Sequence, residues 1–147
     1  MDKPLAYFFI IICSIVICSF SGDYNQEVVV EPLLKTDTTS VGQSINYPCG
    51  TNEEVSMVKV VIAPGKETRW HKHSFPVFAF VEKGTLTVDI ENHGTQTFVQ
   101  GSTFAEVIDT YHNGKNTGKE DVVLIAIYMG QKGKALSEKR TEQNKVK

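Results

Sequence analysis

The sequence predicts an all-β domain, built as a sandwich or a barrel. After residue 21, roughly seven or eight short apolar or alternating runs follow one another, separated by turns that contain glycine. No stretch of this region repeats its apolar residues with the period of a helix. The chain has 147 residues, of which 41% are hydrophobic and 22% are charged, so it is long enough for one domain with its own core.

Residues 1–21 are predicted to be a signal peptide. Lys3 precedes an apolar run over residues 5–18, and Ser19-Phe20-Ser21 supplies the small residues of a signal-peptidase site. We therefore expect an exported protein, either periplasmic or secreted, with no stable membrane insertion after the signal is removed. The length of the run leaves an uncleaved membrane anchor as the alternative. Cleavage would leave Cys49 as the one cysteine of the mature chain, and hence no internal disulfide.

Residues 22–54 are predicted to form an N-terminal arm with short edge strands. Its apolar runs are Val28-Val29-Val30 and Leu33-Leu34, which Pro32 separates. An edge strand exposes unpaired backbone groups that can pair with another chain. The run at Val28 is therefore a candidate edge for a homodimer.

Residues 55–130 are predicted to form the body of the domain. A β-branched strand over residues 55–63 ends at Pro64-Gly65, and further strands are expected over 75–81, 86–90, 95–99, 103–108 and 122–129. Hairpin turns are expected at residues 82–85 and at Asn92-His93-Gly94. Residues 122–129 are apolar throughout, so we expect this strand to be buried on both faces.

The charge distribution argues against nucleic-acid binding. Residues 131–147 hold six Lys or Arg and two Glu, and the rest of the chain after residue 21 is acidic. Nothing resembles a basic stripe with interleaved aromatic residues. The basic tail over 131–147 is predicted to be disordered, because residues 139–147 lack an apolar face. A solvated tail is favoured over one that contacts an anionic membrane surface.

Two histidines that lie two residues apart are candidate metal ligands. His71 and His73 stand in a region of strand-like composition, and a strand would direct both imidazoles to one face. A β-protein presents two nitrogen ligands to a divalent metal in this way. The alternative is a solvent-facing strand without a metal. His112 stands alone and is a candidate only together with this pair, whereas His93 is expected at the surface, in a turn.

The spacing around these histidines resembles the paired motifs of the cupin superfamily. The first motif is Gly-x5-His-x-His-x3,4-Glu-x6-Gly, which this chain matches with Gly65, His71, His73, Val77 and Gly84. The second motif is Gly-x5-Pro-x-Gly-x2-His-x3-Asn, which the chain matches in its spacing at Gly101, His112 and Asn116, with Val107 and Asp109 in the places of the proline and the glycine. The resemblance covers roughly residues 55–130, most of the mature chain.

The resemblance implies an antiparallel double-sheet barrel of the jelly-roll type. His71, His73 and His112 would then bind one divalent transition metal ion, and Fe, Mn, Ni, Cu and Zn all suit imidazole ligands. The partner would be a small organic molecule. Dioxygenase chemistry is frequent in metal-bearing cupins and is the leading reaction. The alternatives are a non-catalytic module that binds a small ligand or a metal, and a metal-free structural barrel. Small cupins also commonly form homodimers.

The chain departs from the first motif at the carboxylate ligand, because Val77 stands in the place of the glutamate. Glu106 is a candidate replacement. It shares a strand face with Phe104 and Ile108, so it is expected to point inward, where a carboxylate is costly without a charge partner or a metal. Glu106 is therefore predicted to be a substitute ligand or a catalytic base beside the metal. The alternative is that Glu106 reaches solvent or pairs with Arg69.

Arg69 and Tyr111 are candidate substrate-binding residues. Arg69 shares the strand parity of the two histidines and could hold an anionic substrate, or it could be a salt-bridge partner. Tyr111 and Trp70 each precede a predicted ligand, although packing is the favoured role of both. Asn116 is expected to hydrogen-bond backbone groups of its own loop.

Overall fold

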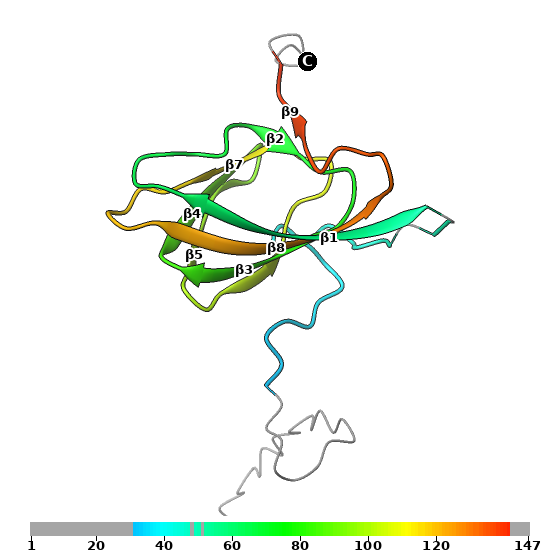
Figure 1. Cartoon of the computed structure of the whole chain (residues 1–147), viewed down its shortest axis with the longest axis horizontal. Coiled ribbons are helices and arrows are strands. Elements are labelled where there is room, and N and C mark those ends of the chain that lie inside the picture. The colour runs from blue at the N-terminus through cyan, green and yellow to red at the C-terminus, as the bar shows by residue number, and fades with distance from the viewer. Residues whose placement is uncertain (1–30, 48, 51, 142–147) are drawn as a thin grey trace, which may run out of the picture. The chain divides into compact units, whose positions relative to one another are not determined.

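Two antiparallel sheets face each other in the computed structural model, which describes residues 31–47, 49, 50 and 52–141 (Figure 1). The strands of this part of the chain are β1 (Glu53–Ile62), β2 (His71–Lys72), β3 (Val77–Lys83), β4 (Thr85–Ile90), β5 (Gly94–Val99), β6 (Thr103–Ala105), β7 (His112–Lys115), β8 (Val122–Gln131) and β9 (Glu138–Lys139). One sheet has the order β1-β8-β3-β6, and the other has the order β5-β4-β7-β2-β9. The predicted all-β, double-sheet architecture is confirmed.

The core lies between the two sheets. Inward residues of both sheets form one apolar cluster: Ile62, Ala79, Val81, Leu86, Val88, Ile90, Phe104, Val107, Val122 and Leu124. A smaller cluster joins Phe75, Val77 and Ala126. Alternation along the strands produces this arrangement, because every second side chain of β3, β4 and β8 points to the opposite sheet. Burying these side chains supplies the main driving force for folding.

The expectation that residues 122–129 are buried on both faces is wrong. β8 pairs with β1 and β3, and only its inward residues, such as Val122, Leu124 and Ala126, are fully buried. The outward ones, such as Ile125 and Ile127, are half-buried. The run is apolar on both faces because the outer side of this sheet is itself apolar.

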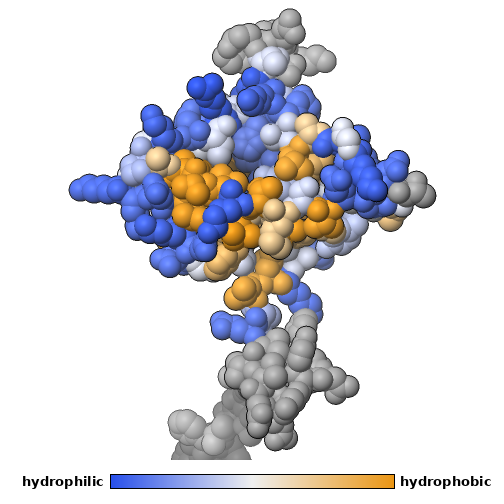
Figure 2. Space-filling view, in the orientation of Figure 1, coloured by the Kyte–Doolittle hydropathy of each residue, from blue (hydrophilic) through white to orange (hydrophobic). Residues whose placement is uncertain are grey.

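An outer apolar face therefore covers β1, β8 and β3. Its residues are Val55, Met57, Val61, Phe78, Phe80, Val123, Ile125, Ile127 and Met129. Val55, Met57 and Val61 are 61%, 67% and 57% exposed. Figure 2 shows the corresponding orange surface over these strands. Antiparallel sheets that face water ordinarily carry polar side chains on that side, so an exposed apolar patch of this kind is a candidate interaction surface.

One predicted hairpin turn is confirmed and the other is wrong. β4 and β5 form a hairpin in which Ile90 and Gly94 are the pair next to the turn, and Asn92 has φ 62° within that turn. The turn at residues 82–85 joins no hairpin, because β3 and β4 belong to different sheets. The chain instead turns a corner at Gly84, with φ 80°. A Cβ atom there would lie 2.8 Å from the carbonyl oxygen of Asp121, so only glycine fits.

The N-terminal arm differs from its prediction where it is described. Leu33-Leu34 form no strand, and this part of the arm contains only an isolated bridge between Thr38 and Ser44. The arm is held by side-chain hydrogen bonds such as Gln43 Nε2 to the carbonyl of Ile108 at 2.9 Å. Val28-Val29-Val30 and the predicted signal peptide lie outside the described residues. No helix in the described part of the chain is long and apolar enough to cross a membrane.

The predicted disorder of the C-terminal tail is wrong for residues 131–141, which we call the C-terminal strap. β9 pairs with β2, with Lys72 opposite Glu138. Beyond it, Arg140 forms an ion pair with Glu91 and lies over the rings of Trp70 and Tyr111, at 4.9 and 4.3 Å from the ring centroids. Backbone pairing and cation–π contacts hold the strap in place. Neither kind of contact requires a periodic pattern of apolar residues, so the sequence gives no sign of this ordered segment. Residues 142–147 lie outside the described part.

Candidate metal centre

The three predicted histidine ligands lie together between the sheets. β2 and β7 are neighbours, and His71 pairs directly with His112 across them, while His73 follows the end of β2. One ligand atom of each imidazole lies within 4.8 Å of the others, so the group could hold a metal ion. His73 and His112 are 2% and 4% exposed. His93, by contrast, is exposed in the turn between β4 and β5, as expected.

Backbone carbonyls fix the tautomer of all three imidazoles. The Nδ1 atoms of His71, His73 and His112 lie 2.8, 2.7 and 3.0 Å from the carbonyl oxygens of Arg69, Leu136 and Thr110. A carbonyl only accepts, so each Nδ1 carries the proton. The Nε2 atoms of His71 and His73 then present lone pairs, and His73 Nε2 is buried without a hydrogen-bond partner. Buried lone pairs of this kind suit a metal ion.

Glu106 points inward and completes the cluster. Its Oε2 atom lies 3.2 Å from Nε2 of both His73 and His112. The contact with His112 is a hydrogen bond, whereas that with His73 lacks the alignment of one. An acceptor oxygen that faces the lone pair of His73 Nε2 is unfavourable unless a proton or a metal cation lies between them, and a divalent metal bound by imidazole nitrogens and a carboxylate would supply that charge.

Glu106 reaches the cluster from the strand beside the position that the family motif assigns to glutamate. The backbone amide of Glu106, just after β6, donates to the carbonyl of Val77 on β3 at 2.8 Å. Val77 itself is 1% exposed and packs against Phe75 and Ala126. The carboxylate therefore comes from the segment that pairs with β3 in the same sheet. The position on β3 where the family motif has glutamate is filled by the apolar side chain of Val77.

The charges of the cluster follow from this geometry. Burial and the neighbouring His112 lower the pKa of His71 to about 4, so this imidazole is neutral at pH 7. Burial would raise the pKa of Glu106, but the imidazoles of His112 and His73 hold it well below its usual range. Burial would likewise lower the pKa of His112, but the Glu106 carboxylate raises it. Without a metal, the His112 imidazole and the Glu106 carboxylate therefore stabilise each other's charged forms.

Arg69 and Tyr111 lie away from the cavity beside the cluster. The Arg69 side chain is exposed, and this residue contributes only its carbonyl oxygen, with φ 65°. The ring of Tyr111 packs beneath Arg140, and its hydroxyl donates to Glu138 at 3.5 Å. Neither residue lines the cavity, which removes the basis for a substrate-binding role of their side chains.

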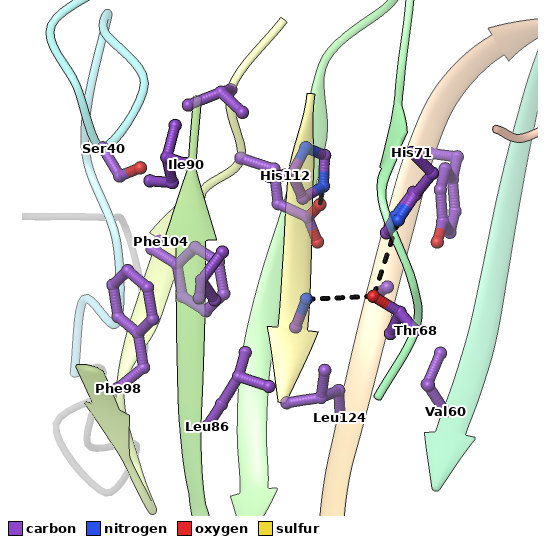
Figure 3. A pocket seen from close by; sticks show the side chains of 16 residues that line it. Ser40, Val60, Thr68, His71, Leu86, Ile90, Phe98, Phe104, His112 and Leu124 are labelled. Carbon is purple, nitrogen blue, oxygen red and sulfur yellow. Dashed lines mark hydrogen bonds and ion pairs between the residues drawn. The ribbon is translucent and has the colours of Figure 1, made fainter. Parts of the chain in front are cut away.

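A small cavity adjoins the cluster (Figure 3). Its lining is largely apolar: Val60, Leu86, Val88, Ile90, Phe98, Phe104, Val107, Leu124 and Ala126. His71, His112 and Glu106 close one part of it. The stacked rings of Phe98 and Phe104, with centroids 3.7 Å apart, form another part of the wall. A ligand in the cavity would therefore contact both the cluster and an apolar wall.

Tyr128 is a functional candidate that the sequence reasoning missed. Its ring packs edge-on against His73, with centroids 5.4 Å apart, and it also lines the cavity. Burial, and then the charge of Glu106, raise the pKa of Tyr128 to about 12. Its hydroxyl is therefore protonated at pH 7 and can donate a hydrogen bond. The signal was strand alternation, because Tyr128 shares the inward parity of Leu124 and Ala126.

Asn116 supports the loop after β7, as predicted. Its side chain is 2% exposed and donates to the carbonyls of Ile62 and Glu120, both at 2.7 Å. Its Oδ1 accepts the amide of Gly118 at 2.9 Å. Asp109 takes the place of the motif's second glycine and has φ 50°, a left-handed conformation that aspartate tolerates better than most residues.

The comparison with protein families decides the identity of the fold. The model described as Cupin domain matches residues 58–128. This chain belongs to the cupin superfamily. The matched region contains all three histidines and Glu106, so the centre lies within the cupin barrel. Among curated proteins, none matches the chain.

Solved structures share the fold of this cupin. A cupin-like protein from Thermotoga maritima is 22% identical, with a TM-score of 0.53, over 61% of this chain and 69% of that one. An oxalate decarboxylase from Lactobacillus farciminis is 20% identical, with a TM-score of 0.52, over 58% and 26%. A DMSP lyase from Ruegeria pomeroyi is 14% identical, with a TM-score of 0.52, over 58% and 42%. This cupin thus spans less than half of the two enzymes, and the likeness is one of fold.

Proposed function

We propose that this cupin is an exported protein that binds one divalent transition metal ion and uses it on a small organic molecule. His71, His73 and His112 would supply nitrogen donors, and Glu106 a carboxylate. The observation that carries the proposal is the convergence of three imidazoles, whose ligand atoms lie within 4.8 Å, on an inward carboxylate beside a cavity. Export rests on the sequence of residues 1–21 alone.

The residues around the centre would have separate roles in a metal-dependent reaction. A bound Fe, Mn, Ni, Cu or Zn ion would act as a Lewis acid or, for a redox-active metal, take part in oxygen chemistry. The carbonyls of Arg69, Leu136 and Thr110 would orient the ligands. The Tyr128 hydroxyl, with a pKa of about 12, would stay protonated and donate a hydrogen bond to a bound molecule.

Elemental analysis of protein purified from the exported fraction tests this proposal. We expect about one transition metal ion per chain, and strong loss of metal from His71→Ala. His93→Ala is the matched control, because His93 is exposed in the β4–β5 turn and should keep its metal. A native protein without stoichiometric metal, in which His71→Ala changes neither metal uptake nor thermal stability, would contradict the proposal.

The reaction that we propose first is oxygen-dependent oxidation of the bound molecule, as a dioxygenase would perform. Glu106 favours an enzyme over the non-catalytic alternative, because the chain retains a carboxylate at the centre although the motif glutamate is absent. Oxygen consumption by the iron-loaded protein with panels of phenols and thiols should reveal turnover. No turnover with any of the five metals would favour a binding module.

We also propose that this cupin forms a homodimer through the outer apolar face rather than through the predicted edge at Val28. Three residues of that face on β1 are more than half exposed. The charged pair on the same side, Lys59 and Glu82, is 2.9 Å apart and balanced within one copy, so two copies would not repel each other there. A second copy would bury apolar side chains that a monomer leaves in water.

A further inference from the structure

We infer that the metal-side cavity takes a small molecule with one polar end and an apolar body, and that it discriminates against dicarboxylates. The inference rests on the proposed function, since the polar end would meet the metal held by His71, His73, His112 and Glu106. It goes further by naming the chemical class of the ligand. The composition of the cavity wall, its charge and its size each support it.

The wall offers an apolar surface to most of a bound molecule. Nine of the residues that line the cavity have purely hydrocarbon side chains, including Leu86, Ile90 and Leu124. Apart from the imidazoles of the cluster, the neutral polar side chains of the wall are those of Ser40, Thr68 and Tyr128. The Thr68 hydroxyl already accepts the amide of Gly114 at 2.9 Å. A molecule that leaves the cluster therefore contacts hydrocarbon first, which favours an alkyl or aryl body.

The wall offers no cation to a second anionic group. Among the described residues that line the cavity, none is Lys or Arg, and the carboxylate present is Glu106. Arg69, the cation predicted to hold an anionic substrate, is exposed outside the cavity. A dicarboxylate could place one carboxylate on the metal but would bury the other against hydrocarbon without a charge partner. Such burial is strongly unfavourable.

The room in the cavity limits the size of the molecule. The cavity has room for roughly four to six waters. A ligand with about six non-hydrogen atoms, such as a four-carbon acid, amide or thiol, matches this volume. The polar end would lie between the imidazoles and the Tyr128 hydroxyl, and the chain would lie toward Phe98 and Phe104.

Calorimetric titration of the zinc-loaded mature chain with butyrate and with malonate tests the inference. The two probes are similar in size, and malonate chelates free zinc better than butyrate does. We expect butyrate to bind at least about tenfold more tightly than malonate, because the second carboxylate of malonate lacks a partner. Tighter binding of malonate, or no binding of butyrate, would overturn the inference, since the metal alone would then decide the ranking.

A cavity-filling variant and a matched control locate the binding. Ala126→Leu adds a branched side chain to the wall and should weaken butyrate binding by at least about tenfold with zinc content unchanged. Ile125→Val, on the outward side of the same strand, should bind butyrate as the native protein does. Unchanged butyrate binding by Ala126→Leu would overturn the inference, and if this variant does not fold, the ranking in the native protein still decides. Zinc content is measured throughout, so a native chain that takes up no zinc contradicts the proposed function instead.

Discussion

At the scale of single residues, Glu106 and Val77 explain how this cupin can lack the motif glutamate and keep a carboxylate at its centre. Their backbones are hydrogen-bonded on adjacent strands at 2.8 Å, so moving the carboxylate from one to the other shifts it by one strand spacing. Val77 then packs against Phe75 and Ala126 where a charge would have stood. The imidazoles of His73 and His112, both 3.2 Å from Glu106, stabilise its ionised form.

Glu106→Gln should lower the affinity for a divalent metal by at least about tenfold, because the amide keeps the size of the side chain but loses its negative charge. Competition with a chromophoric chelator measures the change. Glu120→Gln is the control, since Glu120 is an exposed partner of Lys83 at 3.4 Å and should leave metal affinity unchanged. If Glu106→Gln binds metal as tightly as Glu120→Gln, Glu106 is not a ligand.

The sequence predicted the positions of the centre better than the roles around it. Strand alternation and motif spacing placed His71, His73 and His112 together, and parity alone directed Glu106 inward. The Arg69 side chain lies away from the centre because strand parity does not hold through a residue with positive φ. The bond from His73 to the Leu136 carbonyl joins residues 63 positions apart, a contact that leaves no pattern in the sequence.

At the scale of elements, the C-terminal strap joins the outer edge of the second sheet to the metal centre. β9 pairs with β2, the strand that begins with His71, and the Leu136 carbonyl fixes His73 at 2.7 Å. Arg140 closes the strap through Glu91 and the rings of Trp70 and Tyr111. The strap thus positions two ligands from outside the region of the family match.

Arg140→Ala should loosen the strap and weaken metal binding by about threefold to tenfold, because His73 would lose the carbonyl that fixes its tautomer. Limited proteolysis should cut the variant after Lys132 or Lys134 faster than the native chain. Lys134→Ala, an exposed residue of the same segment, is the control and should keep native affinity. An Arg140→Ala protein with native metal affinity and faster cleavage would show that the strap is independent of the centre.

The corner at Gly84 is the second element on which the barrel depends, and Gly101 offers a matched control. Both glycines have positive φ, 80° and 86°, but a Cβ would meet the Asp121 carbonyl at 2.8 Å only at Gly84. Gly101→Ala should cost about 1 kcal/mol of unfolding free energy for the left-handed backbone. Gly84→Ala should cost at least about 2 kcal/mol more, measured by urea denaturation. Equal losses would mean that the corner tolerates a side chain.

At the scale of the whole molecule, the two-sheet architecture was predictable because the periods and turns of the sequence agree with it along the barrel. The errors arose where pairing is non-local. The corner at residues 82–85 looks like a hairpin because adjacent strands usually pair. The all-apolar run of β8 predicts burial on both faces, whereas its outward residues are half-buried on the outer apolar face. An apolar composition alone does not tell whether a strand face is covered by the rest of the chain or lies on the outside of the sheet.

The outer apolar face predicts a dimer that a single charge disrupts. Met57→Lys places an amine in the middle of β1, at a residue that is 67% exposed, so the monomer should fold as before. Sedimentation should find dimers of the native protein at micromolar concentration and monomers of Met57→Lys. Thr97→Lys, exposed on β5 in the other sheet, should remain dimeric. A native protein that is monomeric throughout would contradict this interface.

Anomalous diffraction from crystals of the metal-loaded protein tests the central claim most directly. We predict one anomalous peak per chain at the absorption edge of the bound metal, within bonding distance of Nε2 of His71, His73 and His112 and of the Glu106 carboxylate. No peak at this cluster, or a peak elsewhere while Glu106 keeps its hydrogen bond to His112, would contradict the account.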